Sequence, residues 1–141
     1  MKIGEIKRQT LIMIFPEIEA SVNEENKESL RDLFIRLRCD PNLKSYIDAC
    51  VPAINRAICL GEIYGALPKG TQRISEKTSE DTDAGLPREI SEIMPYFIKA
   101  EITRGDDPDT AADEEKRYIS LISRMGQQNE TVYTVYSVSE V

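Results

Sequence analysis

The stretch LPREISEIMPYFIKAEITRGDDPDTAA, Leu86–Ala112, decides the fold because it contains the end of one helix and the start of the next. Its apolar residues recur at intervals of three and four, as on one face of a helix: Ile90, Ile93, Met94, Phe97, Ile98 and Ile102. Arg104–Gly105 predicts the end of this helix, with Gly105 as a left-handed cap. Asp107–Pro108 predicts the next start, because Asp accepts hydrogen bonds from free N–H groups and Pro fits the first helical turn.

The same start pattern occurs earlier, at Asp40–Pro41, and predicts a long central helix to about Tyr64. Pro52 lies inside this helix and predicts a kink, because proline removes one backbone hydrogen bond. The sequence GALPKG then ends it. The helix that starts at Pro108 is predicted to run to about Met125 and to bury Ala111, Tyr118, Leu121, Ile122 and Met125.

The first third of the chain also has helical periodicity. Residues 3–15 predict a helix that Pro16 ends. Ser21 and Glu24 have the spacing of a capping box, which predicts that a second helix begins there. Its apolar face is formed by Leu30, Leu33, Phe34 and Leu37.

Three segments lack helical periodicity. Thr71–Ser75 is compatible with a short strand, and residues 76–85 are polar, with nothing to bury, which predicts a mobile polar loop or hairpin tip. Thr131–Val138 is rich in β-branched residues and tyrosine and follows a flexible Gly126–Asn129 hinge, so it predicts a strand.

The predicted fold class is therefore mainly α: a small helical bundle with a kinked long central helix, a polar loop or hairpin, and an extended, β-prone C-terminal arm. Residues 1–128 form the predicted helical domain and residues 129–141 the arm. A chain of 141 residues with 40% hydrophobic and 30% charged residues suits one globular domain. A net charge of −7 disfavours tight DNA binding, although it suits a channel wall that DNA must slide past. No apolar run has membrane-spanning length.

Catalytic, cofactor-binding and metal-binding residues are not predicted. The chain has no His, so neither a zinc site nor a His-activated nucleophile can be assembled from Cys39, Cys50 and Cys59. Cys50 and Cys59 lie among apolar residues and are predicted to be buried free thiols. The acidic run at 106–115 lacks the spacing of a calcium loop and is explained by helix capping. We therefore expect a protein that is not an enzyme, in a reducing cytoplasm.

The C-terminal arm is the predicted partner-binding site. An isolated strand on a helical protein can pair with a strand of another subunit. The alternative is that it pairs with Thr71–Ser75 in the same molecule, and the sequence does not decide between the two. The residues predicted to bind the partner are Val132, Tyr133, Val135, Tyr136 and Val138.

Several segments together resemble a family of small virion proteins of tailed bacteriophages and prophages, the head–tail connector proteins, also called adaptor or neck proteins. IGEIKRQTLIMIF resembles the family's first helix, and AINRAICLGEIYGALPK its long helix. LPREISEIMPYFIKAEI followed by DDPDTAADEEKRYISLI resembles its last two helices, and the tail rich in Val, Tyr and Ser also fits. The likeness is weaker in residues 16–38 and 76–85.

The resemblance implies a structural role in the virion neck, after synthesis in the bacterial host cytoplasm. The chain would form a homo-oligomeric ring of about twelve copies beneath the portal. Its partners would be the portal protein, the next neck or tail protein and itself, while DNA passes the lumen without specific binding and no membrane is involved. Residues 132–138 would be the docking arm, and loop 76–85 would face the lumen or the next ring. The alternative function is a small cytoplasmic helical module that regulates a protein partner.

Overall fold

The computed structural model describes the backbone of residues 1–22 and 28–139 and the side chains of residues 1–22 and 28–129. This part of the chain contains α1 (Ile3–Ile14), the short 3-10 helix η1 (Pro16–Ile18), α2 (Glu19–Val22), α3 (Leu30–Leu37), α4 (Pro41–Ile63), α5 (Arg88–Ile102) and α6 (Pro108–Ser139). It contains no β-strand, only an isolated antiparallel bridge between Lys2 and Asp83. The predicted mainly α fold class is confirmed.

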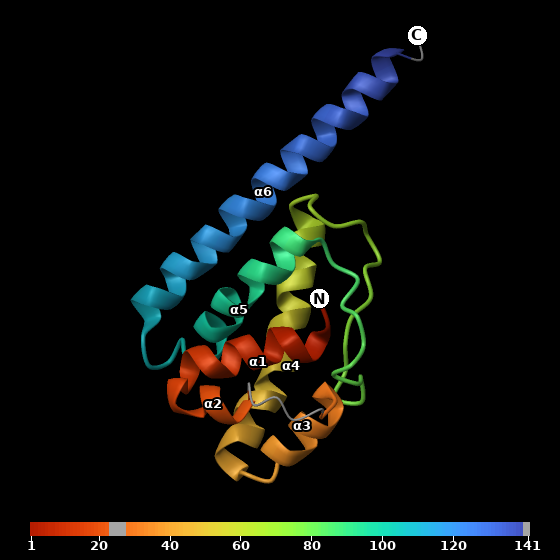
Figure 1. The fold of residues 1–141 in the computed structure, drawn as a ribbon. Helices are drawn as coiled ribbons and strands as arrows, with labels where there is room; N and C mark the ends of the chain where they lie inside the picture. Colours follow the sequence, from red (N-terminus) through yellow and green to blue (C-terminus); the bar gives the residue numbers. More distant parts are fainter. Residues whose placement is uncertain (23–27, 140–141) are drawn as a thin grey trace.

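Helix α5 is the centre of the bundle, because it packs against α1, α4 and α6 (Figure 1). Its predicted apolar face is turned inward: Ile90, Met94, Phe97 and Ile98 are buried, and Ile93 and Ile102 are half-buried. The other helices complete the main core with Ile6, Cys50, Ile54, Ala57, Ile58, Tyr118 and Ile122. The 3-4 spacing of apolar residues thus allows α5 to pack against three helices, α1, α4 and α6.

A second core cluster lies between α1, α2, α3 and the beginning of α4. It contains Leu11, Val22, Leu33, Phe34, Leu37 and Ile47. The start of α3 is fixed by Ser29, whose Oγ accepts a hydrogen bond from the N–H of Asp32 at 3.1 Å. The predicted start at Ser21 is wrong, because Ser21 lies inside α2. Glu24, the other half of the predicted capping box, lies outside the described residues.

Both Asp–Pro starts are confirmed. Asp40 accepts a hydrogen bond from the N–H of Asn42 at 3.0 Å, and Asp107 accepts one from the N–H of Thr110 at 3.2 Å. The helix after Asp40 runs without a break through Pro52, as predicted, and the kink at Pro52 stays a prediction.

The two glycines predicted to end helices behave differently. Gly65, after α4, has φ +80° and takes the left-handed conformation that glycine allows. Gly105 does not have a positive φ, so its predicted role as a left-handed cap is wrong. The chain leaves α5 instead by a turn in which the carbonyl of Thr103 accepts hydrogen bonds from the N–H groups of Asp106 and Asp107, at 3.0 and 3.1 Å.

The strand predicted at Thr71–Ser75 is absent from the structure. The side-chain amide of Asn55, on α4, donates to the carbonyl of Ile74 and accepts from its N–H, both at 2.9 Å. This pair of bonds satisfies the backbone groups that a strand partner would otherwise satisfy. The segment is therefore held as an irregular strap along α4.

The prediction that residues 76–85 have nothing to bury is also wrong. The carbonyls of Glu80 and Thr82 accept hydrogen bonds from the first N–H groups of α1, at Gly4 and Ile3, both at 2.9 Å. The carboxylate of Asp81 accepts one from the N–H of Leu30, at the start of α3, at 3.0 Å. The first N–H groups of a helix have no partner within it, so this segment caps two helices at once.

Glu80, in this segment, is a charged residue in the interior of the protein, and only 3% of it is exposed. Its carboxylate oxygen lies 3.5 Å from Nζ of the fully buried Lys7 and 2.5 Å from a guanidinium nitrogen of Arg38. We call these three residues the buried ion cluster. It joins α1, the end of α3 and the 76–85 segment, because the buried carboxylate of Glu80 pairs with two cations, of which Arg38 is partly exposed.

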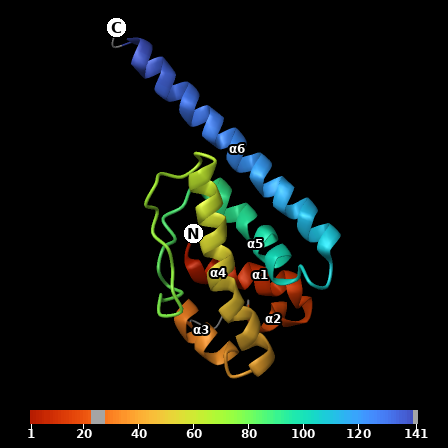
Figure 2. The same ribbon diagram turned by 180° about the vertical axis from the view of Figure 1, so that it is seen from behind.

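The C-terminal part of the chain differs most from the prediction. Helix α6 includes the predicted Gly126–Asn129 hinge and continues to Ser139, so the extended arm predicted for residues 129–141 is not confirmed. Each residue added to an existing helix gains a hydrogen bond without a new nucleation step. The β-branched residues gain nothing comparable here, because the described part of the fold has no strand to pair with them. Figures 1 and 2 show that α6 extends past the rest of the bundle.

Candidate functional site

Helix α6 is fixed to the bundle by Tyr118, which is 1% exposed. Its hydroxyl donates a hydrogen bond to the carbonyl of Ala57, on α4, at 2.8 Å. Its ring lies against that of Phe97, on α5, with 4.7 Å between the ring centroids. Burial raises the pKa of Tyr118, so the hydroxyl stays protonated and remains a donor. One side chain thus ties α6 to both α4 and α5.

Near its last contacts with the bundle, helix α6 crosses the end of α4 at Gly126. Helix α6 passes so close to the end of α4 that a Cβ atom at Gly126 would lie 1.9 Å from the carbonyl oxygen of Tyr64. One turn later, the side-chain amide of Asn129 donates to the carbonyl of Gly65 at 3.0 Å. Only a residue without a side chain permits this approach, so Gly126 fixes where α6 leaves the bundle.

Beyond this crossing lie residues 130–139 of α6, which we call the projecting end (Figures 1 and 2). The structure gives them a helical backbone, and their side chains lie outside the described part. Along a helical backbone, residues on one face recur every three or four positions, and not at every second position as on a strand. The projecting end contains all five residues predicted to bind the partner: Val132, Tyr133, Val135, Tyr136 and Val138.

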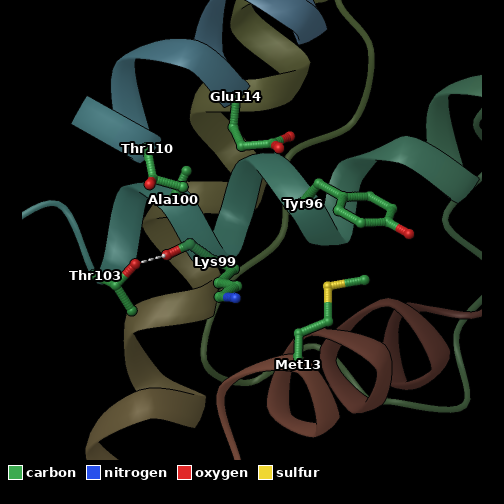
Figure 3. A pocket seen from close by; sticks show the side chains of 7 residues that line it. All are labelled: Met13, Tyr96, Lys99, Ala100, Thr103, Thr110 and Glu114. Atoms are coloured by element: carbon green, nitrogen blue, oxygen red, sulfur yellow. Dashed lines mark hydrogen bonds between the residues drawn. The ribbon is translucent and has the colours of Figure 1, made fainter. Parts of the chain in front are cut away.

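At the other end of α6 a groove opens between α1, α5 and α6, with a volume of about 190 Å³. We call it the α1–α5–α6 groove. Met13 points from α1 toward the face of α5 that carries Tyr96 and Lys99, and α6 contributes the opposite wall (Figure 3). The lining residues are Met13, Tyr96, Lys99, Ala100, Thr103, Thr110 and Glu114.

Most polar groups of the α1–α5–α6 groove are already bonded within the protein. The hydroxyl of Thr103 donates to the carbonyl of Lys99 at 2.7 Å, and that of Thr110 donates to the carboxylate of Asp107 at 2.7 Å. Glu114 lies 3.8 Å from Arg117, whose guanidinium lies 5.6 Å from the centroid of the Tyr96 ring. Lys99 makes no ion pair among the described residues. The groove therefore offers apolar surface and one cation without an ion pair, whose charge also helps to lower the pKa of Asp107.

A second cluster of charged residues, which we call the interhelical ion network, consists of Arg56, Glu101, Arg104 and Glu115. Arg56 donates to Glu101 and, at 2.7 Å, to Glu115. Arg104 donates to Glu101 at 2.6 Å and to Glu115 at 2.8 Å. Burial raises the pKa of Glu115, but hydrogen bonds from Arg104 and Arg56 outweigh it and hold this pKa below its usual value. The two carboxylates share both arginines, and these bonds join α4, α5 and α6.

The acidic run at 106–115 has a structural role in this fold. Asp107 caps α6, and hydrogen bonds from Thr110 hold the pKa of Asp107 below its usual range. The described residues include no group of three or more metal-ligand side chains that could hold an ion. The capping interpretation of this run is confirmed at Asp107.

The three cysteines have different environments. Cys50 is buried as predicted, and burial raises the pKa of its thiol to about 12. Cys59 is exposed, so its predicted burial is wrong, and Cys39 is exposed as well. Cys59 lies on the outer face of α4. The preceding residue, Ile58, is buried in the core, whereas Cys59 is exposed.

One feature of the sequence indicates the α1–α5–α6 groove. Tyr96 lies outside the apolar face of α5, between Met94 and Phe97, and 44% of it is exposed. A large aromatic residue outside the buried face of an amphipathic helix is a reason to expect a contact surface.

No helix in the described part of the chain has the length and apolar character needed to cross a membrane.

Compared with models of protein families, with curated protein sequences and with solved structures, the chain gives no match.

Proposed function

We propose that this chain is a structural virion protein of a tailed phage, a head–tail connector that forms a ring under the portal and links capsid to tail. The proposal starts from the resemblance of the chain to that family, which covers α1, the second half of α4, α5, the first half of α6 and the tail rich in Val, Tyr and Ser. Its physical support is a small helical body with a long terminal helix and a net charge of −7.

The observation that carries the proposal is the projecting end of α6. A helix of about ten residues is marginally stable in water by itself, so such an end gains most when it packs on another surface. Its sequence, ETVYTVYSVS, is rich in valine and tyrosine and contains no Lys or Arg. Subunits of a ring need a surface that reaches a neighbour, and this end extends past the rest of its own bundle (Figure 1).

In the proposed ring, the partners of the chain are the portal protein, the next neck or tail protein and further copies of itself. The projecting end serves as the docking arm, through Val132, Tyr133, Val135, Tyr136 and Val138. Its helical backbone favours docking into a groove over strand addition. A bend of α4 at Pro52 is part of the proposal, because Pro52 leaves the carbonyl of Asp48 without its helical partner. The acidic surface lets DNA pass without binding.

Quantitative mass spectrometry of purified tailed particles tests this function. The particles are purified from the source bacterium after induction, and labelled peptides of this chain and of the portal protein serve as standards. We expect a fixed copy number, about equal to that of the portal. Detection of the chain in the lysate but not in purified particles would refute the connector function and would favour a regulatory module instead.

A further inference from the structure

We propose that the α1–α5–α6 groove is the receptor for the projecting end of α6 of a second copy of this chain. The inference rests on the proposed function, because it names the contact by which neighbouring copies in the ring would associate. The groove is a surface that the sequence did not single out. In the proposed contact, one subunit contributes the groove and its neighbour contributes the projecting end.

The size and chemistry of the groove suit a protein side chain better than a small molecule. Its volume of about 190 Å³ is below the roughly 300–1,000 Å³ of ligand pockets. Tyr96 and Met13 provide apolar surface, and the hydroxyls of Thr103 and Thr110 are engaged in bonds within the protein. No convergent set of polar groups is left to fix a small polar ligand. One or two apolar side chains of a helix would fill this space.

The charges of the two surfaces are complementary. The chain carries no Lys or Arg after Arg124, and the valines and tyrosines of residues 131–138 are flanked by Glu130 and Glu140. Two charged residues line the groove. Lys99 makes no ion pair in the described part of the structure, whereas Glu114 lies near Arg117. An acidic, apolar segment therefore meets an apolar groove with one available positive charge.

The geometry requires that this segment come from another copy. Thr110 and Glu114, in the wall of the groove, belong to the same helix as the projecting end. From Thr110 to residue 130 an α-helix rises about 30 Å, and α6 has no break in which it could fold back. The groove and the projecting end thus lie at opposite ends of one rigid element. Each copy offers one of each, which gives a head-to-tail contact that closes into a ring when the rotation permits.

Disulfide cross-linking of the full-length protein tests this contact. In a background with Cys39→Ser and Cys59→Ser, Thr110→Cys in the groove is combined with Val135→Cys in the projecting end. Under mild oxidation we expect a ladder of dimers, trimers and larger species, because every chain carries one donor and one acceptor. A mixture of the two single variants should give dimers only. Met13→Cys, on α1, provides a second groove position if Thr110→Cys lowers the yield of folded protein.

The matched control replaces Thr110→Cys with Ser120→Cys, which is exposed on the same helix, and no ladder is expected from it. Ladders of equal strength from both groove and control positions would overturn the proposal, and so would the absence of any interchain link from either groove position. A link within one chain would do the same, because it requires α6 to fold back.

Charge reversal tests the role of Lys99. We expect Lys99→Glu to lower the rate of cross-linking about two- to five-fold, as for an exposed ion pair, and Glu130→Lys with Glu140→Lys to restore it. Lys116→Glu, an exposed reversal on α6, serves as the control and should leave the rate unchanged. An effect of Lys116→Glu equal to that of Lys99→Glu would overturn the assignment of Lys99.

The inference and the proposed function fail in distinguishable ways. A cross-linked ladder from a chain that is absent from purified particles would leave the groove contact standing and refute the connector. A chain present at fixed copy number in particles, but without groove cross-links in the purified protein or in the particles, would refute the groove contact alone.

Discussion

Substitution of Gly126 by alanine tests whether α6 crosses the end of α4 as closely as the structure describes. The new Cβ would lie 1.9 Å from the carbonyl oxygen of Tyr64, about 1.5 Å short of an ordinary contact. No rotamer change can relieve this overlap, because both atoms belong to or adjoin the backbone. Helix α6 must therefore move away from α4, and the hydrogen bond from Asn129 to Gly65 must lengthen or break.

The expected change in the free energy of unfolding is the difference between two effects. Forcing an extra carbon into a packed contact costs about 1–3 kcal/mol. Alanine in the interior of a helix is about 1 kcal/mol more favourable than glycine, which offsets part of that cost. A contact of 1.9 Å to a backbone oxygen puts the cost near the top of this range, so we expect Gly126→Ala to lower the free energy of unfolding by about 2 kcal/mol. For a chain of this size the melting temperature would fall by about 6 °C.

The assay is urea and thermal unfolding followed by circular dichroism at 222 nm, with Gly105→Ala as the matched control. A Cβ at Gly105 meets nothing within 4 Å, and its φ is not positive, so this variant should differ from the parent protein by less than about 0.5 kcal/mol. A Gly126→Ala protein as stable as the parent, or more stable, would refute the close crossing. The residue would then be the flexible hinge that the sequence suggested.

Four further predictions concern the packing and the charges. Tyr118→Phe removes the hydrogen bond to Ala57 but keeps the ring, so thermal melts should show a loss of about 1 kcal/mol; an unchanged melt contradicts that bond. Glu80→Gln leaves Lys7 buried without a carboxylate and should cost about 3 kcal/mol in urea unfolding, whereas the exposed Glu89→Gln should cost almost nothing. The pKa of Glu115 is lowered in the folded protein, so ionised Glu115 stabilises the fold at pH values above its unfolded pKa near 4.5. This stabilisation is lost as the pH falls through the folded pKa of Glu115. Thermal melts from pH 6 to about pH 3 should show the loss of stability, and Glu115→Gln should make that loss smaller. A thiol reagent should modify Cys39 and Cys59 in the native protein and Cys50 only after unfolding, because burial raises the pKa of Cys50 to about 12; rapid reaction of all three thiols would contradict its burial.

The sequence predicted best what depends on neighbouring residues. The Asp–Pro pairs at residues 40–41 and 107–108 each start a helix, because the cap and its N–H donors lie within three residues of each other. The 3-4 periodicity of α5 identified its buried face for the same reason. These elements would be recognisable in any fold that contains them.

What the sequence did not predict depends on partners distant in the chain. Glu80 is buried beside Lys7, 73 residues earlier, and Arg38, 42 residues earlier, and no local pattern predicts these pairs. Gly126 looks like a hinge among polar residues, yet it is the point at which α6 passes against Tyr64. The groove beside Tyr96 exists only where α1, α5 and α6 meet. Each of these features is a property of the tertiary arrangement and not of a segment.

The helical backbone of the projecting end changes what can hold a partner there. A strand added to a sheet gains hydrogen bonds from its own backbone, so many sequences can bind in this way. A helix has satisfied its backbone internally, and its affinity must come from side chains that fill a complementary surface. Contact with the α1–α5–α6 groove would therefore depend on the identity of a few apolar residues, and with Lys99 as the one available cation it would depend only weakly on salt. Repetition around a closed ring would strengthen an association of this kind, because each further contact would form within the same assembly.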